Sequence, residues 1–196
     1  QPAMVYDLAD VEDGDREVLR VYGAQGQGSY GVPLAGGHDV DGDGFADVAV
    51  AYMTAAFDGR FQAGEVDLIF GDGTVDGSLD TAVDQPRVLR FVGSATKEHL
   101  GSEIWMDDVT GDGLGDLLIC RQDFTLGQHC GVGALTVVAG GAGLRTHAQT
   151  LAPVDTAAAD PAGVVTTTVV GQVAGDRFCI WLRTDDVDGD GIADVV

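Results

Sequence analysis

Positive charge is scarce in this sequence. Its 196 residues hold 10 Lys and Arg residues against 32 Asp and Glu residues, for a formal net charge of −22, and Lys97 is the single lysine. Nucleic acids and anionic membranes are bound through basic surface patches. The composition therefore argues against nucleic acid as a partner and favours the binding of cations.

Long hydrophobic runs are missing as well. No apolar stretch approaches the ~20 residues that a helix needs to span a bilayer, so we expect no membrane insertion. No signal peptide is visible, and the chain begins with Gln1 in place of Met, which indicates a processed protein or a fragment. Hydrophobic residues make up 45% of the chain, which is enough for a folded core despite the charge.

An acidic segment occurs three times along the chain. It reads DVDGDGFAD at 39–47, DVTGDGLGD at 108–116 and DVDGDGIAD at 186–194, and apolar residues follow each copy. Two further landmarks recur in a fixed order around these copies: an upstream apolar run that ends in Gly23, Gly93 or Gly171, and a downstream run, GEVDLIFG at 64–71 and GALTVVAG at 133–140. Such self-similarity predicts a fold built from repeated units.

The apolar runs within each unit have the character of β-strands. They are short, rich in β-branched residues and bounded by glycine, aspartate or proline. We expect strands at 29–37, 47–53, 64–70 and 87–92, and then at 99–106, 116–120, 133–139 and 164–170, with loops at 54–63, 71–86 and 140–163. Four antiparallel strands per repeat predict an all-β protein made of β-propeller blades.

The repeat divides the chain into four parts. Residues 1–28 are predicted to be the outer strands of a preceding blade, 29–97 one blade, 98–176 a second blade with an insertion, and 177–196 the start of a further blade. Propellers close with about four or more blades. We therefore expect the rest of the ring to come from the same protein or from a partner chain.

The acidic segments have the pattern of a calcium-binding loop. Asp39, Asp41 and Asp43 stand at positions 1, 3 and 5, where side chains converge if the loop curls, and the intervening glycines permit that curl. The carbonyl of Phe45 at position 7 and the carboxylate of Asp47 at position 9 complete an all-oxygen shell, which Ca²⁺ prefers and zinc does not.

The EF-hand, a calcium loop between two helices, does not fit this pattern. Its loop carries a bidentate glutamate at position 12, where this chain has Val50 and Ile119. In the second copy Thr110 replaces the aspartate at position 3, so we expect weaker binding there.

The three cysteines leave several pairings open. Cys120 and Cys130 bracket a polar loop between two predicted strands, and a disulfide closing that hairpin is the favoured interpretation. The alternatives are two reduced thiols, or a zinc site formed with His129. Cys179 is left over, either free or paired outside this chain.

The repeats resemble a known family. YGVPLAGGHDVDGDGFADVAVAY, LGSEIWMDDVTGDGLGDLLIC and FCIWLRTDDVDGDGIADVV are similar to FG-GAP repeats, the blades of the integrin α-subunit N-terminal propeller and of many bacterial secreted proteins. The resemblance implies a propeller of about seven blades. By position it implies three Ca²⁺ sites, formed by Asp39, Asp41, Asp43, Phe45 and Asp47; by Asp108, Thr110, Asp112, Leu114 and Asp116; and by Asp186, Asp188, Asp190, Ile192 and Asp194.

The expected function is that of a non-catalytic calcium-binding module. We expect it in a secreted, cell-surface or periplasmic protein, in adhesion or in recognition of a protein or glycan. The resemblance does not extend to integrin-like ligand binding, because the GAP half of the repeat is degraded and Cys179 replaces the glycine of FG in the last unit. The alternatives are the propeller portion of an extracellular hydrolase or lyase, and a structural subunit of a surface appendage.

Overall fold

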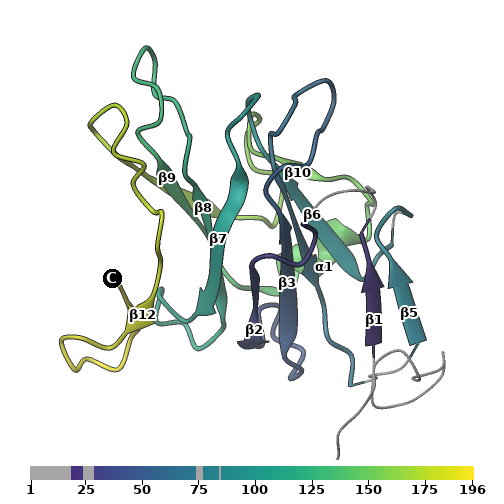
Figure 1. Cartoon of the computed structure of the whole chain (residues 1–196). Coiled ribbons are helices and arrows are strands. Elements are labelled where there is room, and N and C mark those ends of the chain that lie inside the picture. The colour runs from purple at the N-terminus through teal and green to yellow at the C-terminus, as the bar shows by residue number, and fades with distance from the viewer. Residues whose placement is uncertain (1–18, 24–28, 74–76, 84) are drawn as a thin grey trace, which may run out of the picture.

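The computed structural model describes residues 19–23, 29–73, 77–83 and 85–196. Within these ranges the chain is mostly strands with one short helix, which confirms the all-β prediction. The strands form two large sheets and two pairs that stand side by side, with β12 at one side of Figure 1 and the β1–β5 pair at the other. None of the described sheets closes on itself.

The first large sheet has the strand order β10-β6-β4-β3-β2. Its strands β2 (Leu34–His38), β3 (Asp47–Tyr52), β4 (Glu65–Ile69) and β6 (Val88–Val92) pair antiparallel, each with its neighbour. These four strands match the four that the sequence predicts for this unit, and only β2 extends beyond its predicted range, by one residue at His38. The prediction held for β3, β4 and β6 because each is rich in β-branched or alternating apolar residues and lies between turn segments, whereas β2 (LAGGH) was found through its place in the repeat.

The second large sheet repeats this arrangement. Its strands β7 (Leu100–Asp107), β8 (Asp116–Arg121), β9 (Ala134–Val138) and β11 (Thr166–Val170) pair antiparallel in the order β11-β9-β8-β7. A third and shorter unit contributes β12 (Thr184–Asp185) and β13 (Asp194–Val195), which pair antiparallel. In all three units the acidic segment connects two adjacent antiparallel strands.

The insertion of the second unit contains structure that the sequence did not predict. Residues 140–163, predicted as a loop, form the helix α1 (Ala142–Ala148) and the strand β10 (Val154–Asp155). Strand β10 pairs in parallel with β6 of the first sheet, so the insertion adds a fifth strand to the neighbouring unit. Seven helical residues are too few for a 3.6-residue period to stand out in the sequence.

The segments around the first unit also differ from the prediction. Strand β1 (Leu19–Tyr22) pairs in parallel with β5 (Gly77–Asp80), which lies in the segment 71–86 predicted as a loop. Leu19 and Val21 pack on the outer face of the first sheet, which explains why this short pair forms there. The other predicted strand of residues 1–28 lies outside the described residues.

The main core lies between the two large sheets. Leu68 and Phe91 of the first sheet and Ile104 and Leu117 of the second are buried in it, and Leu144 of α1 joins them. A smaller cluster on the far side of the second sheet packs against the third unit. No helix in the described part of the chain has the length and apolar character that a membrane crossing requires.

Candidate metal centre

The three acidic loops fold in one shared conformation. The carboxylate at position 1 of each loop accepts hydrogen bonds from the backbone N–H groups at positions 4 and 6. At Asp39 the two N···O distances are 2.7 and 2.8 Å, and at Asp108 they are also 2.7 and 2.8 Å. The carboxylate at position 5 accepts the N–H of position 7 in each copy. The first aspartate therefore fixes the curl of the loop.

Glycine at positions 4 and 6 is a steric requirement of this curl. Gly42 and Gly44 have φ values of 82° and 91°, and the equivalent glycines of the other two loops lie between 75° and 89°. A side chain at such positive φ is strained, whereas glycine adopts it without steric strain. The repeated Gly-Asp-Gly pattern in the sequence follows directly from this geometry.

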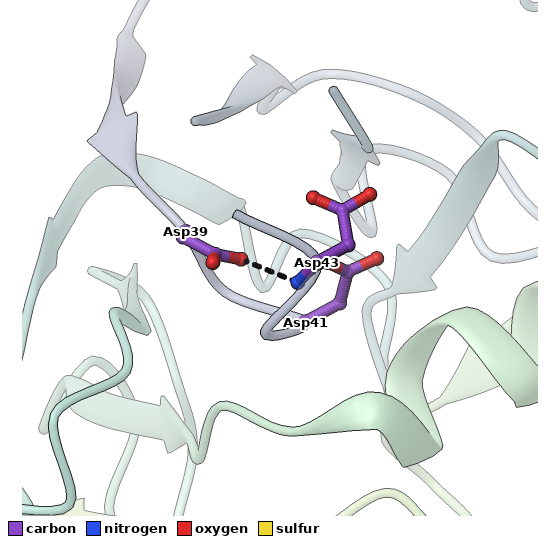
Figure 2. Close-up of side chains that lie close together, drawn as sticks. All are labelled: Asp39, Asp41 and Asp43. Carbon is purple, nitrogen blue, oxygen red and sulfur yellow. Dashed lines mark hydrogen bonds between the residues drawn. The ribbon is translucent and has the colours of Figure 1, made fainter. Parts of the chain in front are cut away.

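Two of the three loops gather carboxylates closely enough to hold one ion. Asp39, Asp41 and Asp43 each offer an oxygen within 4.8 Å of the others, and Figure 2 shows the three side chains around the first loop. In the third loop the group with this spacing is Asp186, Asp188 and Asp194. All six are hard oxygen donors, the kind that Ca²⁺ prefers.

The second loop does not bring three acidic side chains together in this way. Thr110 stands where the other loops have a carboxylate, and among the described residues Asp108, Asp112 and Asp116 do not form such a group. The Thr110 hydroxyl is 3.5 Å from the Asp116 carboxylate. Weaker binding at this copy stays a prediction.

The aspartate at position 9 has a structural task in the first two loops. Asp47 is fully buried, and its two oxygens accept the N–H groups of Val40 and Gly71, both at 2.7 Å. Asp116 does the same with Val109 and Gly140, at 2.9 and 2.8 Å. These bonds tie the start of the loop to the end of the third strand of the same sheet. Burial raises the pKa of Asp47, and the two backbone donors offset part of that rise.

Adjacent loops are joined by one repeated contact. The N–H of Gly115 in the second loop donates to the carbonyl of Asp39 in the first, at 2.8 Å. The N–H of Ala193 in the third loop donates to the carbonyl of Asp108 in the second, at 3.1 Å. The position-7 side chains of the later loops, Leu114 and Ile192, lie over the position-4 glycines of the loops before them.

A basic side chain enters the first loop from outside its own unit. Arg145 of α1 forms ion pairs with both Asp41 and Asp43, and its Nη2 atom also donates to the carbonyl of Gly71 at 2.7 Å. The guanidinium lies 5.0 Å from the centre of the Phe70 ring. More than one hundred residues separate Arg145 from these aspartates, and no feature of the sequence indicates the contact.

The disulfide differs from the predicted one. Cys120 pairs with Cys179, with a Cα–Cα distance of 5.5 Å, and Cys130 is a free, exposed thiol. Cys120 lies opposite Leu135 in the strand ladder, whereas Cys130 lies five residues earlier, near the tip of the hairpin. Five residues span about 16 Å along a strand, which is too far for a disulfide. The predicted Cys120–Cys130 bond is therefore wrong.

Comparison with known proteins does not identify a family for this chain. No protein-family model matches the chain, and no characterised protein matches its sequence. The resemblance to FG-GAP repeats therefore remains a prediction.

Proposed function

We propose that the chain is a calcium-binding module built from FG-GAP-type propeller blades, and that it acts in adhesion or in recognition of a protein or glycan without catalysis. The observation that carries the proposal is the shared loop conformation, in which one hydrogen-bond pattern recurs at Asp39, Asp108 and Asp186. In two of these loops it accompanies three carboxylates within reach of one ion.

The donor set fits calcium better than zinc or copper. The acidic groups in the first and third loops are carboxylates, with no sulfur or imidazole among them. Ca²⁺ takes six to eight oxygen ligands in flexible loops, whereas zinc and copper favour softer ligands. Asp39, Asp41 and Asp43 would hold one ion and Asp186, Asp188 and Asp194 another, and each ion would offset the repulsion among its carboxylates.

The repeated junction between units supports the propeller architecture. Leu100 donates its N–H to Ala63, and the equivalent Phe178 donates to Val132, both at 2.9 Å. A constant contact from one four-stranded unit to the next is what a ring of blades needs. The disulfide between Cys120 and Cys179 suits a secreted or cell-surface location, where disulfides form and persist.

Thermal unfolding with and without calcium tests the proposal. Ions that bind only the folded state stabilise it by about 2.7 kcal/mol at one hundred times the dissociation constant. We expect the melting temperature to rise by several degrees in excess Ca²⁺ relative to a chelator, and Asp186→Asn with Asp188→Asn to remove part of that rise. Superimposed melting curves would contradict calcium binding.

A further inference from the structure

Arg145 pairs with two of the three carboxylates that cluster in the first loop. Its Nε and Nη2 atoms contact one oxygen each of Asp41 and Asp43, which are two of the three clustered carboxylates. A guanidinium and a divalent cation repel each other and compete for the same lone pairs. The first loop therefore already holds a cation that belongs to the chain itself.

The first and third loops also differ in exposure. The Asp41 side chain is 1% exposed, whereas Asp188, at the same position of the third loop, is an exposed residue. Among the described residues no arginine or lysine pairs with the aspartates of the third loop. The two candidate sites thus have similar carboxylates, but among the described residues only those of the first loop are paired with a basic side chain.

Arg145 is one of several contacts that hold the insertion of the second unit on the first. The β10 strand pairs with β6, and Asp155 at its end forms a two-point ion pair with Arg60, at 2.7 and 2.8 Å. Leu144 of α1 is buried in the core between the sheets. An event that releases Arg145 from the loop removes one of these contacts and leaves the others in place.

We propose that Arg145 is a built-in competitor of Ca²⁺ at the first loop, so that ion binding there displaces its side chain and loosens α1. The inference rests on the proposed calcium function. Linkage makes the effect reciprocal: whatever holds Arg145 in the loop weakens calcium binding at this loop, and calcium weakens the attachment of α1 by the same factor. The first loop is then a calcium-responsive site, and the third binds without this competition.

Calcium titration of matched variants tests the inference. Arg145→Met keeps an unbranched side chain over Phe70 but removes the charge, and Arg60→Met removes a different ion pair of the same insertion. We expect Arg145→Met to tighten one class of calcium sites by about tenfold, a gain that Asp41→Asn abolishes. Arg60→Met should leave calcium affinity unchanged. Melting curves of each variant establish that it is folded.

The outcomes separate the two proposals. Unchanged or weaker binding at the first loop in Arg145→Met, with the third loop still binding calcium, would overturn the competition and leave the calcium function intact. No calcium binding at any loop would overturn both. As a second readout, calcium should accelerate hydrogen exchange of the α1 amides in the unmodified chain but not in Arg145→Met. Equal exchange rates with and without calcium in the unmodified chain would contradict the displacement.

Discussion

Glu65 and Asp67 lie buried on β4 and share one cationic partner. Their residues are 4% and 0% exposed, and the Arg90 guanidinium is 3.3 Å from the Glu65 carboxylate and 2.9 Å from that of Asp67. The Tyr30 hydroxyl donates to Asp67 at 3.0 Å, and Arg90 also donates to the carbonyl of Thr81. Burial, followed by repulsion from Asp67, raises the pKa of Glu65 to about 7, although Arg90 opposes the rise.

This raised pKa predicts a loss of stability as the pH increases. Between pH 4.5 and 7 the folded chain holds a proton on Glu65 that the unfolded chain has released, so the free energy of unfolding falls through this window, by about 3 kcal/mol for this group. Glu65→Gln keeps an oxygen for Arg90 and removes the ionisation. We expect it to be more stable than the unmodified chain at pH 8 and no more stable at pH 4.5, by urea unfolding at both pH values in excess calcium. An equal difference at the two pH values would contradict the shift.

Residues whose task is local could be read from the sequence. Position 1 and the glycines of each acidic loop act within a few residues, so the spacing alone indicated the curl. The bond from Gly71 to Asp47 and the ion pairs of Arg145 depend on groups 24 and 102–104 residues away, which spacing does not encode. The same limit explains the cysteines, because Cys120 joins Cys179 across 59 residues.

At the scale of elements, two glycines let successive units approach closely. A Cβ atom on Gly64 would lie 2.2 Å from the carbonyl oxygen of Leu100, and one on Gly133 would lie 2.2 Å from that of Phe178. Both positions have positive φ, 91° and 77°. The backbones of neighbouring sheets therefore touch at one equivalent point in each junction.

Gly64→Ala is predicted to destabilise the fold through this contact. Gly59 provides a matched control, because its φ of 77° is also positive but an added Cβ would meet no atom within 4 Å. Both alanine variants bear backbone strain, whereas only the variant at Gly64 forces two backbones apart. We expect Gly64→Ala to lower the free energy of unfolding by about 1–3 kcal/mol more than Gly59→Ala. Equal losses in denaturant unfolding would contradict the junction model.

The element predictions failed where an element depends on another unit. All eight predicted strands of the two main units appear, because most of the runs are rich in β-branched or alternating residues and the repeat places the others. Strands β5 and β10 were missed: they are four and two residues long and pair in parallel with distant segments. Such strands form because they pair with or pack on a neighbouring sheet. A run as short as Val154–Asp155 has no periodic pattern from which a strand could be predicted.

Over the whole molecule, the disulfide links the second unit to the third. Cys120 lies on β8 and is buried, Cys179 precedes β12, and both pack with Leu118, Leu135 and Leu182. The third unit contributes two strands of two residues each to the described structure, so its attachment depends strongly on this cluster. The bond closes a loop of 59 residues, for which the chain-entropy model gives about 4 kcal/mol.

Replacing a disulfide-bonded cysteine and replacing the free cysteine are expected to have different effects on stability. Cys179→Ala should lower the melting temperature by several degrees and speed hydrogen exchange in residues 177–196 more than in β3 or β4. Cys130→Ala should leave both unchanged, because that thiol is exposed and unpaired. Peptide mapping without reduction should recover Cys120 linked to Cys179. A Cys120–Cys130 peptide in native protein would contradict this pairing.

The acidic motif serves two separable purposes: some of its aspartates, such as Asp47 and Asp116, hold the turn together, and others gather where an ion could bind. The aspartates at positions 1 and 9 hold backbone N–H groups, so the turn needs them whether or not an ion is present. The carboxylate at position 3 also accepts a backbone N–H in the first and third loops, at 3.2 and 3.1 Å, but the second loop keeps the shared curl with Thr110 at that position. Replacement of a position-3 carboxylate by a neutral side chain is therefore expected to weaken ion binding at that loop, while the loop keeps its fold and most of its calcium-type sequence pattern.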